Sequence, residues 1–267
     1  MSDQNPTPPG DDPIFGEQPA AANDPVLGGG STPPPPPPPP MPPAPPAGPG
    51  AGDTVSSAFS WAVAKFQENI GVWVGLAAVV FALNAAQTII SRVINNNSGN
   101  SAGGVFAGLG ITLVLGVVFG VLAWLASIGV YRAALRRSQG TQPSFDMLTT
   151  GENLLPYVVV AIVYGIATVV GLALCILPGV AVIFLFLFAP FFALDKGQSV
   201  GEAFGNSYRL VTQNFGAVVL VAIVNILASI LGSLPFTFGL LTLVTLPFSA
   251  LFTVHAYRTL QNEPVAP

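Results

Sequence analysis

The chain has 267 residues, of which 51% are apolar and only 7% are charged, and its net charge is −4. A soluble domain carries about 25% charged residues, so much of this surface must lie against lipid or protein rather than water. The acidic balance argues against nucleic acid as a partner, because the basic residues form no cluster larger than Arg132, Arg136 and Arg137.

The first segment, residues 1–52, is rich in Pro, Gly and Ala and contains no basic residue. Such a segment cannot bury enough apolar surface to offset chain entropy, so we predict a disordered, proline-rich cytoplasmic tail without a secretory signal. The unbroken run Pro33–Pro40 predicts a stiff polyproline II rod, because proline fixes φ. The rod is interpreted either as a spacer, the commoner role, or as a ligand for an aromatic groove on a cytoplasmic protein.

Six apolar stretches occupy residues 53–260, and none of them contains Asp, Glu, Lys or Arg. A helix needs about 20 apolar residues to cross the hydrocarbon core of a bilayer, where unpaired backbone groups are costly. We therefore predict an all-α polytopic membrane protein with six transmembrane helices, the fourth of them short and carrying Pro190. The predicted spans are Ile70–Ile90, Val105–Tyr131, Leu154–Ile176, Val180–Leu194, Phe215–Leu234 and Pro235–Tyr257.

The basic residues set the expected orientation. Of the eight Lys and Arg residues, all but Arg92 fall in segments that six spans would place on one side. The side that carries the excess of Lys and Arg is normally cytoplasmic. We therefore expect a multi-pass protein of the plasma membrane with both termini in the cytoplasm, where residues 261–267 form a short C-terminal tail.

One pattern occurs twice: an amphipathic lead-in, an Asn and then an apolar helix. Phe59 and Asn69 recur as Phe204 and Asn214, in both cases 145 positions later (59 to 204, 69 to 214). We predict that both lead-ins are interfacial helices along the inner leaflet, with their polar faces in water. The two Asn residues are expected to cap the membrane helices that follow. Capping-box spacing is present in the second lead-in, at Ser199 and Glu202.

The six spans are also predicted to form three hairpins. The first ends at Tyr131-Arg132 and the third at Tyr257-Arg258, so both end in the same dipeptide. The middle hairpin opens at Asn153, in the place that Asn takes in the repeat, although its lead-in does not align with the other two.

The second span carries a small residue at every fourth position. This spacing lets helices approach closely in lipid, where packing drives their association. The partner helix could belong to the same chain or to a second copy, so a homo-oligomer through this span is one expectation. The residues are Gly104, Gly108, Thr112, Gly116 and Gly120.

The sequence predicts no catalytic, cofactor-binding or metal-binding residues. His255 is the only histidine and Cys175 the only cysteine, so no metal-ligand spacing, nucleophile with a base, or intrachain disulfide is available. His255 is interpreted as a hydrogen-bonded interface residue in preference to a proton relay. The polar residues inside the spans could line a pathway, although interhelical hydrogen bonds explain them equally well; they are Asn84, Gln87, Asn225 and Ser229.

The stretch from Phe186 to Asp195, with Leu177-Pro178-Gly179 before it and Asn214-Phe215-Gly216 after it, resembles a broad set of bacterial six-helix membrane proteins. These include the membrane domain that is fused to some glycerophosphoryl diester phosphodiesterases. With its tail, the chain is similar to stand-alone proline- and glycine-rich transmembrane proteins of actinobacteria. The resemblance implies a six-helix fold over about residues 57–260, and it implies no enzymatic activity because the phosphodiesterase domain is missing.

Two functions follow as expectations. The first is a non-enzymatic scaffold or interaction platform that presents the cytoplasmic proline-rich tail to partners. The second is a carrier or channel for a lipid or another apolar small molecule, because many transporters are built from repeats. An embedded enzyme is the weakest hypothesis, since the spans lack catalytic residues.

Overall fold

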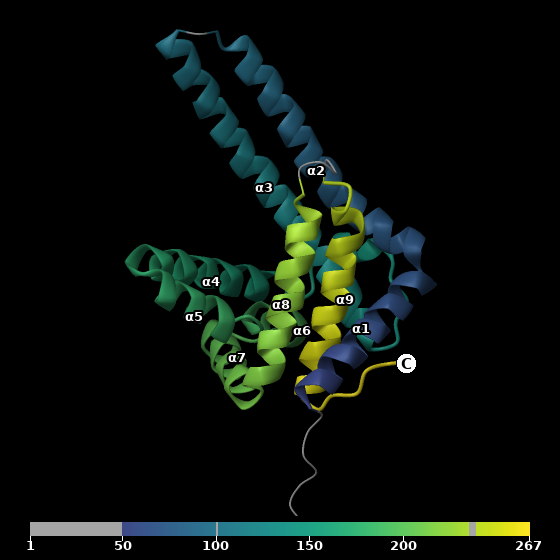
Figure 1. Ribbon diagram of the computed structural model, residues 1–267. Helices are drawn as coiled ribbons and strands as arrows, with labels where there is room; N and C mark the ends of the chain where they lie inside the picture. Colours follow the sequence, from purple (N-terminus) through teal and green to yellow (C-terminus); the bar gives the residue numbers. More distant parts are fainter. Residues whose placement is uncertain (1–49, 100, 235–238) are drawn as a thin grey trace, which may run out of the picture. The chain divides into compact units, whose positions relative to one another are not determined.

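A computed structural model describes residues 50–99, 101–234 and 239–267 of the chain, and within these residues all regular structure is helical. The predicted disordered tail lies almost wholly outside the described residues. The elements are α1 (Ala51–Glu68), α2 (Ile70–Asn97), α3 (Ala102–Ser138), η1 (Phe145–Leu148), α4 (Leu154–Leu174), α5 (Ile176–Leu185), α6 (Ala189–Lys196), α7 (Val200–Gln213), α8 (Phe215–Gly232) and α9 (Thr242–Leu260) (Figure 1).

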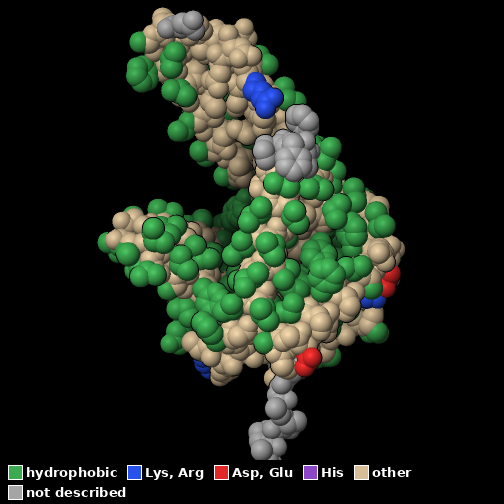
Figure 2. All heavy atoms as spheres, viewed as in Figure 1, with side chains coloured by type: hydrophobic (Ala, Val, Ile, Leu, Met, Phe, Trp, Pro, Cys, Tyr) green, Lys and Arg blue, Asp and Glu red, His purple; other side chains and the backbone are tan. Residues whose placement is uncertain are grey.

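Five helical segments in the described residues are long and apolar enough to cross a membrane. They are α2, α3, α4, the combined segment Ile176–Lys196 that contains α5 and α6, and α8. Large hydrophobic side chains stand exposed along these helices, among them Phe106, Leu113 and Val169. Figure 2 shows hydrophobic side chains over much of the visible face and few charged ones. Such a surface is stable in lipid and not in water, so the helices are typical of a multi-pass membrane protein.

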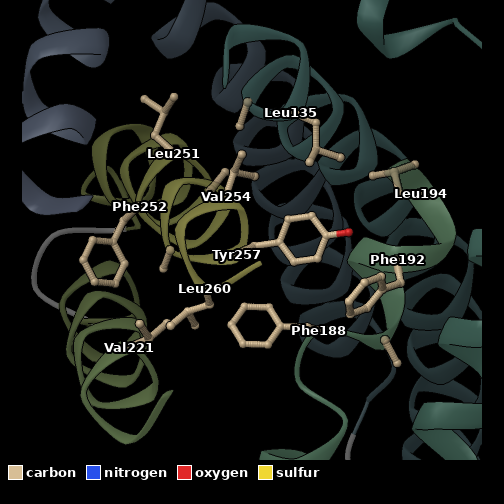
Figure 3. Close-up of a cluster of buried hydrophobic side chains, with 14 of the residues drawn as sticks. Leu135, Phe188, Phe192, Leu194, Val221, Leu251, Phe252, Val254, Tyr257 and Leu260 are labelled. Atoms are coloured by element: carbon tan, nitrogen blue, oxygen red, sulfur yellow. The ribbon is translucent and has the colours of Figure 1, made fainter. Parts of the chain in front are cut away.

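The helix that matches the predicted sixth span, α9, is not among the five. It contacts α1, α2, α3 and α8, and almost every side chain from Ala250 to Arg258 is buried. Tyr257 is one of the largest fully buried side chains, and it lies beside Phe188 and Phe192 in Figure 3. The polar residues Thr253, His255 and Arg258 of α9 are therefore buried in protein, and they lower the hydropathy of this helix.

The glycine stripe of α3 packs against α2 of the same chain near the N-terminus of α3. A Cβ built on Gly104 would meet the backbone oxygen of Ser98 at 1.9 Å, and one on Gly108 would meet Ser98 Oγ at 2.3 Å. Thr112 Oγ1 donates a hydrogen bond to Asn95 Oδ1 at 3.3 Å. At Gly120 a Cβ would meet nothing within 4 Å. The first half of the stripe is thus explained by the α2–α3 hairpin, which Figure 1 shows side by side.

The fourth predicted span is an interrupted helix. α5 ends at Leu185 and α6 begins at Ala189, so the break precedes Pro190. Pro190 lies in the first turn of α6, where the missing N–H has no helical partner in any case, and the proline therefore fits without breaking a hydrogen bond. With both pieces, the segment extends from Ile176 to Lys196, beyond the predicted Val180–Leu194 at each end.

The twofold repeat is visible in the helix boundaries. α1 ends at Glu68 and α7 at Gln213, 145 positions later, and α2 and α8 begin two residues after these ends. The linking residues Asn69 and Asn214 share a backbone conformation, with φ/ψ of −138°/44° and −126°/33°. Asn153 differs, because it has the left-handed values 52°/18°. The backbone conformation at the linking Asn therefore matches the α1–α2 join with the α7–α8 join. The Asn that precedes α4 does not share this conformation.

Asn69 and Asn214 occupy the N-cap positions of α2 and α8, as predicted, but the expected side-chain caps are absent. Neither side chain accepts a capping hydrogen bond. Asn69 Nδ2 donates to Gln142 Oε1 at 3.2 Å, and Asn214 Nδ2 donates back to Leu210 O at 3.0 Å. The backbone turns so tightly at each Asn that its N–H still bonds the preceding helix. The capping box of α7 is present, since Glu202 accepts from the backbone and hydroxyl of Ser199.

Candidate functional site

Buried charges lie at one end of α6 and α9. Arg258 donates to Asp195 Oδ1 at 2.6 Å and also pairs with Glu263. Both side chains of the first pair are under 10% exposed. Lys196 extends the group, because its Nζ lies 2.6 Å from both Glu263 Oε1 and Gln261 Oε1. Two cations and two carboxylates balance one another, as buried charges require.

The C-terminal segment, residues 261–267, is docked onto this end of the molecule. Trp61 Nε1 donates to Ala266 O at 2.8 Å, and the backbone N–H of Ala266 donates to Ser138 O at 2.8 Å. Burial alone would raise the pKa of Glu263, but its hydrogen bonds with Lys196 and Arg258 outweigh burial and lower that pKa below 4.5. Residues 261–267, predicted as a short C-terminal tail, therefore pack on α1 and α3.

A second group of charges joins the lead-in helix α1 to α3. Glu68 pairs with Lys65 of its own helix and with Arg137 of α3. The hydrogen bond from Lys65, then that from Arg137, lowers the pKa of Glu68. Trp73 Nε1 donates to Lys65 O at 3.0 Å and locks the first turn of α2 against the end of α1.

The Tyr-Arg dipeptides that end the first and third predicted hairpins flank α6. The ring of Phe191 in α6 lies 5.5 Å from that of Tyr131 and 5.8 Å from that of Tyr257. The two arginines next to these tyrosines differ. Arg258 binds carboxylates, whereas Arg132 donates to two backbone carbonyls, one of them that of Glu152 at 2.8 Å. The sequence match thus corresponds to equivalent packing around one helix, with unlike partners for the charges.

Ser207 fills the break between α5 and α6. Its hydroxyl donates to Leu185 O at 3.0 Å and accepts from the backbone N–H of Phe188 at 3.2 Å. Ser207 is fully buried. An interrupted helix leaves backbone groups that must find partners at membrane depth, and a side chain from the neighbouring α7 supplies both here. The sequence contains no signal for this role, because a serine in an amphipathic lead-in with its polar face in water is expected to bond water.

The polar residues predicted inside the spans are divided between two roles. Asn225 joins α8 to α9, because its Oδ1 accepts from Ser249 and from Thr253 Oγ1 at 3.0 Å. Ser229 and Asn84 donate to carbonyls of their own helices. Gln87 lies near Gly116 of α3. Asn225 is therefore an interhelical link, which was one of the two interpretations left open.

His255 and Cys175 show no arrangement for chemistry. The ring of His255 packs 5.3 Å from that of Trp61, and its Nδ1 lies 3.3 Å from Thr259 Oγ1. Cys175 is exposed, in the single extended residue between α4 and α5. Among the described residues, no group of three or more His, Cys, Asp and Glu side chains could hold a metal ion.

The helices and their apolar surfaces define a helical multi-pass membrane protein. The chain is 29% identical over 233 residues to the uncharacterized protein Rv2560 of Mycobacterium tuberculosis, covering 80% of this chain and 71% of that protein. The uncharacterized protein Mb2590 of Mycobacterium bovis matches to the same extent. No family model and no solved structure matches the chain. The relatives fit the expected bacterial source, while no family match supports the resemblance to the phosphodiesterase membrane domain.

Proposed function

We propose that the chain crosses the plasma membrane six times as three hairpins, with both ends in the cytoplasm and α9 as the last span. Three contacts support this topology. Trp61 bonds Ala266, Ser138 bonds Ala266, and Lys196 pairs with Glu263. Residues 261–267, which follow the last span, therefore contact three other segments: the one before the first span, the one after the second and the one after the fourth. If these contacts lie outside the bilayer, an even number of crossings separates the segments, which supports α9 as a sixth span after α8.

On this topology we propose a non-enzymatic platform that presents residues 1–52 to a cytoplasmic protein, with residues 53–260 as its membrane domain. The supporting observation is the ion-paired end of the molecule. Glu68 ties α1 to α3, whereas Asp195 and Glu263 tie α6, α9 and the C-terminal segment together. The hydrogen bonds of Ala266 with Trp61 and Ser138 join the two groups. α1 begins at Ala51, directly after the proline-rich segment, and it packs on α8 and α9. The proline-rich segment would thus be attached to a helix that is packed against the membrane domain. A self-associated platform would present several copies of this segment.

Affinity capture in mild detergent tests the platform. The full chain is expected to retain at least one cytoplasmic protein that a variant lacking residues 2–49 does not retain. A matched control replaces Pro33–Pro40 by an equal number of alternating Gly and Ser, which keeps the length and removes the rod. Identical captures from all three proteins, together with an unchanged phenotype of the truncation, would rule out tail docking as the function.

A carrier of a lipid or another apolar small molecule is the second candidate. The observation that favours it is the interrupted span, since discontinuous helices at the interface of structural repeats form the substrate sites of many transporters. α6 lies between the two equivalent tyrosines Tyr131 and Tyr257. Purified protein in vesicles should then accelerate movement of a labelled lipid between leaflets. Rates equal to those of protein-free vesicles across a panel of lipids would exclude this role.

A further inference from the structure

A polar hollow of about 360 Å³ lies among α2, α3, α8 and α9, at the level of the predicted spans. This volume falls within the range of small-molecule sites. Most of the lining residues carry a hydroxyl or an amide, and none of them is charged. The residues that the argument uses are Asn84, Tyr131, Ser229, Thr245 and Ser249.

Several polar atoms in this hollow have no hydrogen-bond partner within the described part of the chain. Thr245 Oγ1 makes no hydrogen bond there, nor does Tyr131 Oη. Asn84 uses its Nδ2 to reach Val80 O at 2.8 Å, which leaves its Oδ1 free to accept. Polar groups at membrane depth are costly when unpaired, so the hollow holds either water or a ligand that supplies donors and acceptors. Because the lining is uncharged, the polar part of such a ligand is uncharged too.

A second hollow, of about 200 Å³, shares one lining residue with the first, Tyr131. Its walls are aromatic and apolar, and they include Tyr157, Leu187 and Phe191. Pro190, just after the break in the fourth predicted span, also lines it. Hydroxyl and amide side chains of the first hollow and apolar side chains of the second therefore meet at Tyr131. This residue has an apolar ring and a polar hydroxyl.

We propose that these two hollows bind an uncharged amphiphile: a hydroxyl-bearing head group lies in the polar hollow and a hydrocarbon chain in the aromatic one. Thr245, Asn84 and Tyr131 supply the free acceptors and donors that a hydroxyl can satisfy in either role. Asn84 and Ser229 are exposed, so the polar hollow opens to the molecular surface, where lipid has access to it. Binding of this kind does not depend on residues 1–52.

Native mass spectrometry of the full-length protein in detergent tests the proposal with three probes that share one acyl chain. Monooleoylglycerol offers two hydroxyls, methyl oleate offers none, and oleate carries a charge. We expect saturable binding of monooleoylglycerol, with affinity at least tenfold above that for the other two. Equal affinity for all three probes, or no saturable binding of monooleoylglycerol, would overturn the proposal and leave the hollow to water.

Two substitutions locate the site. Thr245→Val removes a hydroxyl without changing its shape, and Asn84→Leu removes the free acceptor; each should weaken monooleoylglycerol binding about fivefold, as expected for one lost hydrogen bond. The matched control is Thr168→Val in α4, whose hydroxyl bonds only Tyr164 O of its own helix. Binding that is insensitive to Thr245→Val and Asn84→Leu, or equally sensitive to Thr168→Val, would contradict this location. None of these substitutions should affect the capture of a protein by residues 1–52. Amphiphile binding and tail docking can therefore be disproved independently.

Discussion

At the scale of single residues, Ser207 has the largest predicted effect. Its hydroxyl donates to Leu185 O and accepts from the N–H of Phe188, on the two sides of the helix break. Ser207→Ala would leave both groups unpaired in a buried place, which costs about 1–3 kcal/mol. For a chain of this size each kcal/mol corresponds to about 2–4 °C in melting temperature.

A thermal melt in detergent measures this loss. The matched control is Ser60→Ala, because Ser60 is exposed and bonds only Ser57 O within α1. We expect a clearly lower melting temperature for Ser207→Ala and an unchanged melting temperature for the control. Equal melting temperatures for the two variants would show that the break finds other partners, such as water.

The residue scale is also where sequence reasoning reached least far. It correctly favoured an interface role for His255 and offered an interhelical hydrogen bond for Asn225, because a lone polar side chain in an apolar helix has few other partners. It had no means of pairing Asp195 with Arg258, since these are 63 positions apart. The side-chain caps at Asn69 and Asn214 failed because the backbone there has no extended residue from which a side chain could reach forward.

At the scale of helices, the glycine stripe of α3 yields a comparison within one helix. Gly108→Leu should separate α3 from α2, because even a Cβ would meet Ser98 Oγ at 2.3 Å. Gly120→Leu should not, since a Cβ there meets nothing within 4 Å. The spacing of small residues alone does not distinguish these two positions; only the packing of α2 does.

The rate of disulfide formation between Asn95→Cys and Thr112→Cys measures how closely α2 and α3 approach, because the native side chains are in hydrogen-bond contact. A Cys175→Ser background removes the single native thiol. Gly108→Leu should slow this cross-link severalfold while Gly120→Leu leaves it unchanged. Equal slowing by both would mean that the whole stripe packs against α2, and slowing by neither would mean that α2 accommodates the larger side chain.

Helix positions were predictable to a useful extent, and the reasons differ between elements. Long apolar runs without charge marked α2, α3, α4 and α8, since lipid demands both properties at once. The fourth span was predicted as short and carrying Pro190. In the structure the helix breaks at Phe186–Phe188, just before this proline, which lies in the first turn of α6 and does no harm there. The sixth span was predicted from its uncharged apolar run Pro235–Tyr257, but α9 is not among the helices that qualify by hydropathy. It packs against four helices, where polar side chains such as Thr253 and His255 are buried in protein.

At the scale of the whole molecule, five helical segments of the described residues qualify as spans by composition, whereas the contacts of α1, α3 and α6 with residues 261–267 favour six. The difference decides on which side of the membrane the C-terminus lies. With six crossings Ser60 and Pro267 share a side, and the turn at Cys175, after three crossings, lies on the other. With α9 outside the membrane, Pro267 would change sides relative to Ser60.

Labelling with a membrane-impermeant maleimide in intact cells distinguishes these topologies. We expect the native Cys175 to react from outside, because it is exposed and lies between α4 and α5. In a Cys175→Ser background, Ser60→Cys and Pro267→Cys should react only after the membrane is permeabilised. Labelling of Pro267→Cys without permeabilisation, while Ser60→Cys stays protected, would show five crossings. Labelling of both with Cys175 protected would reverse the orientation and place the proline-rich segment outside the cell, where no cytoplasmic protein could bind it.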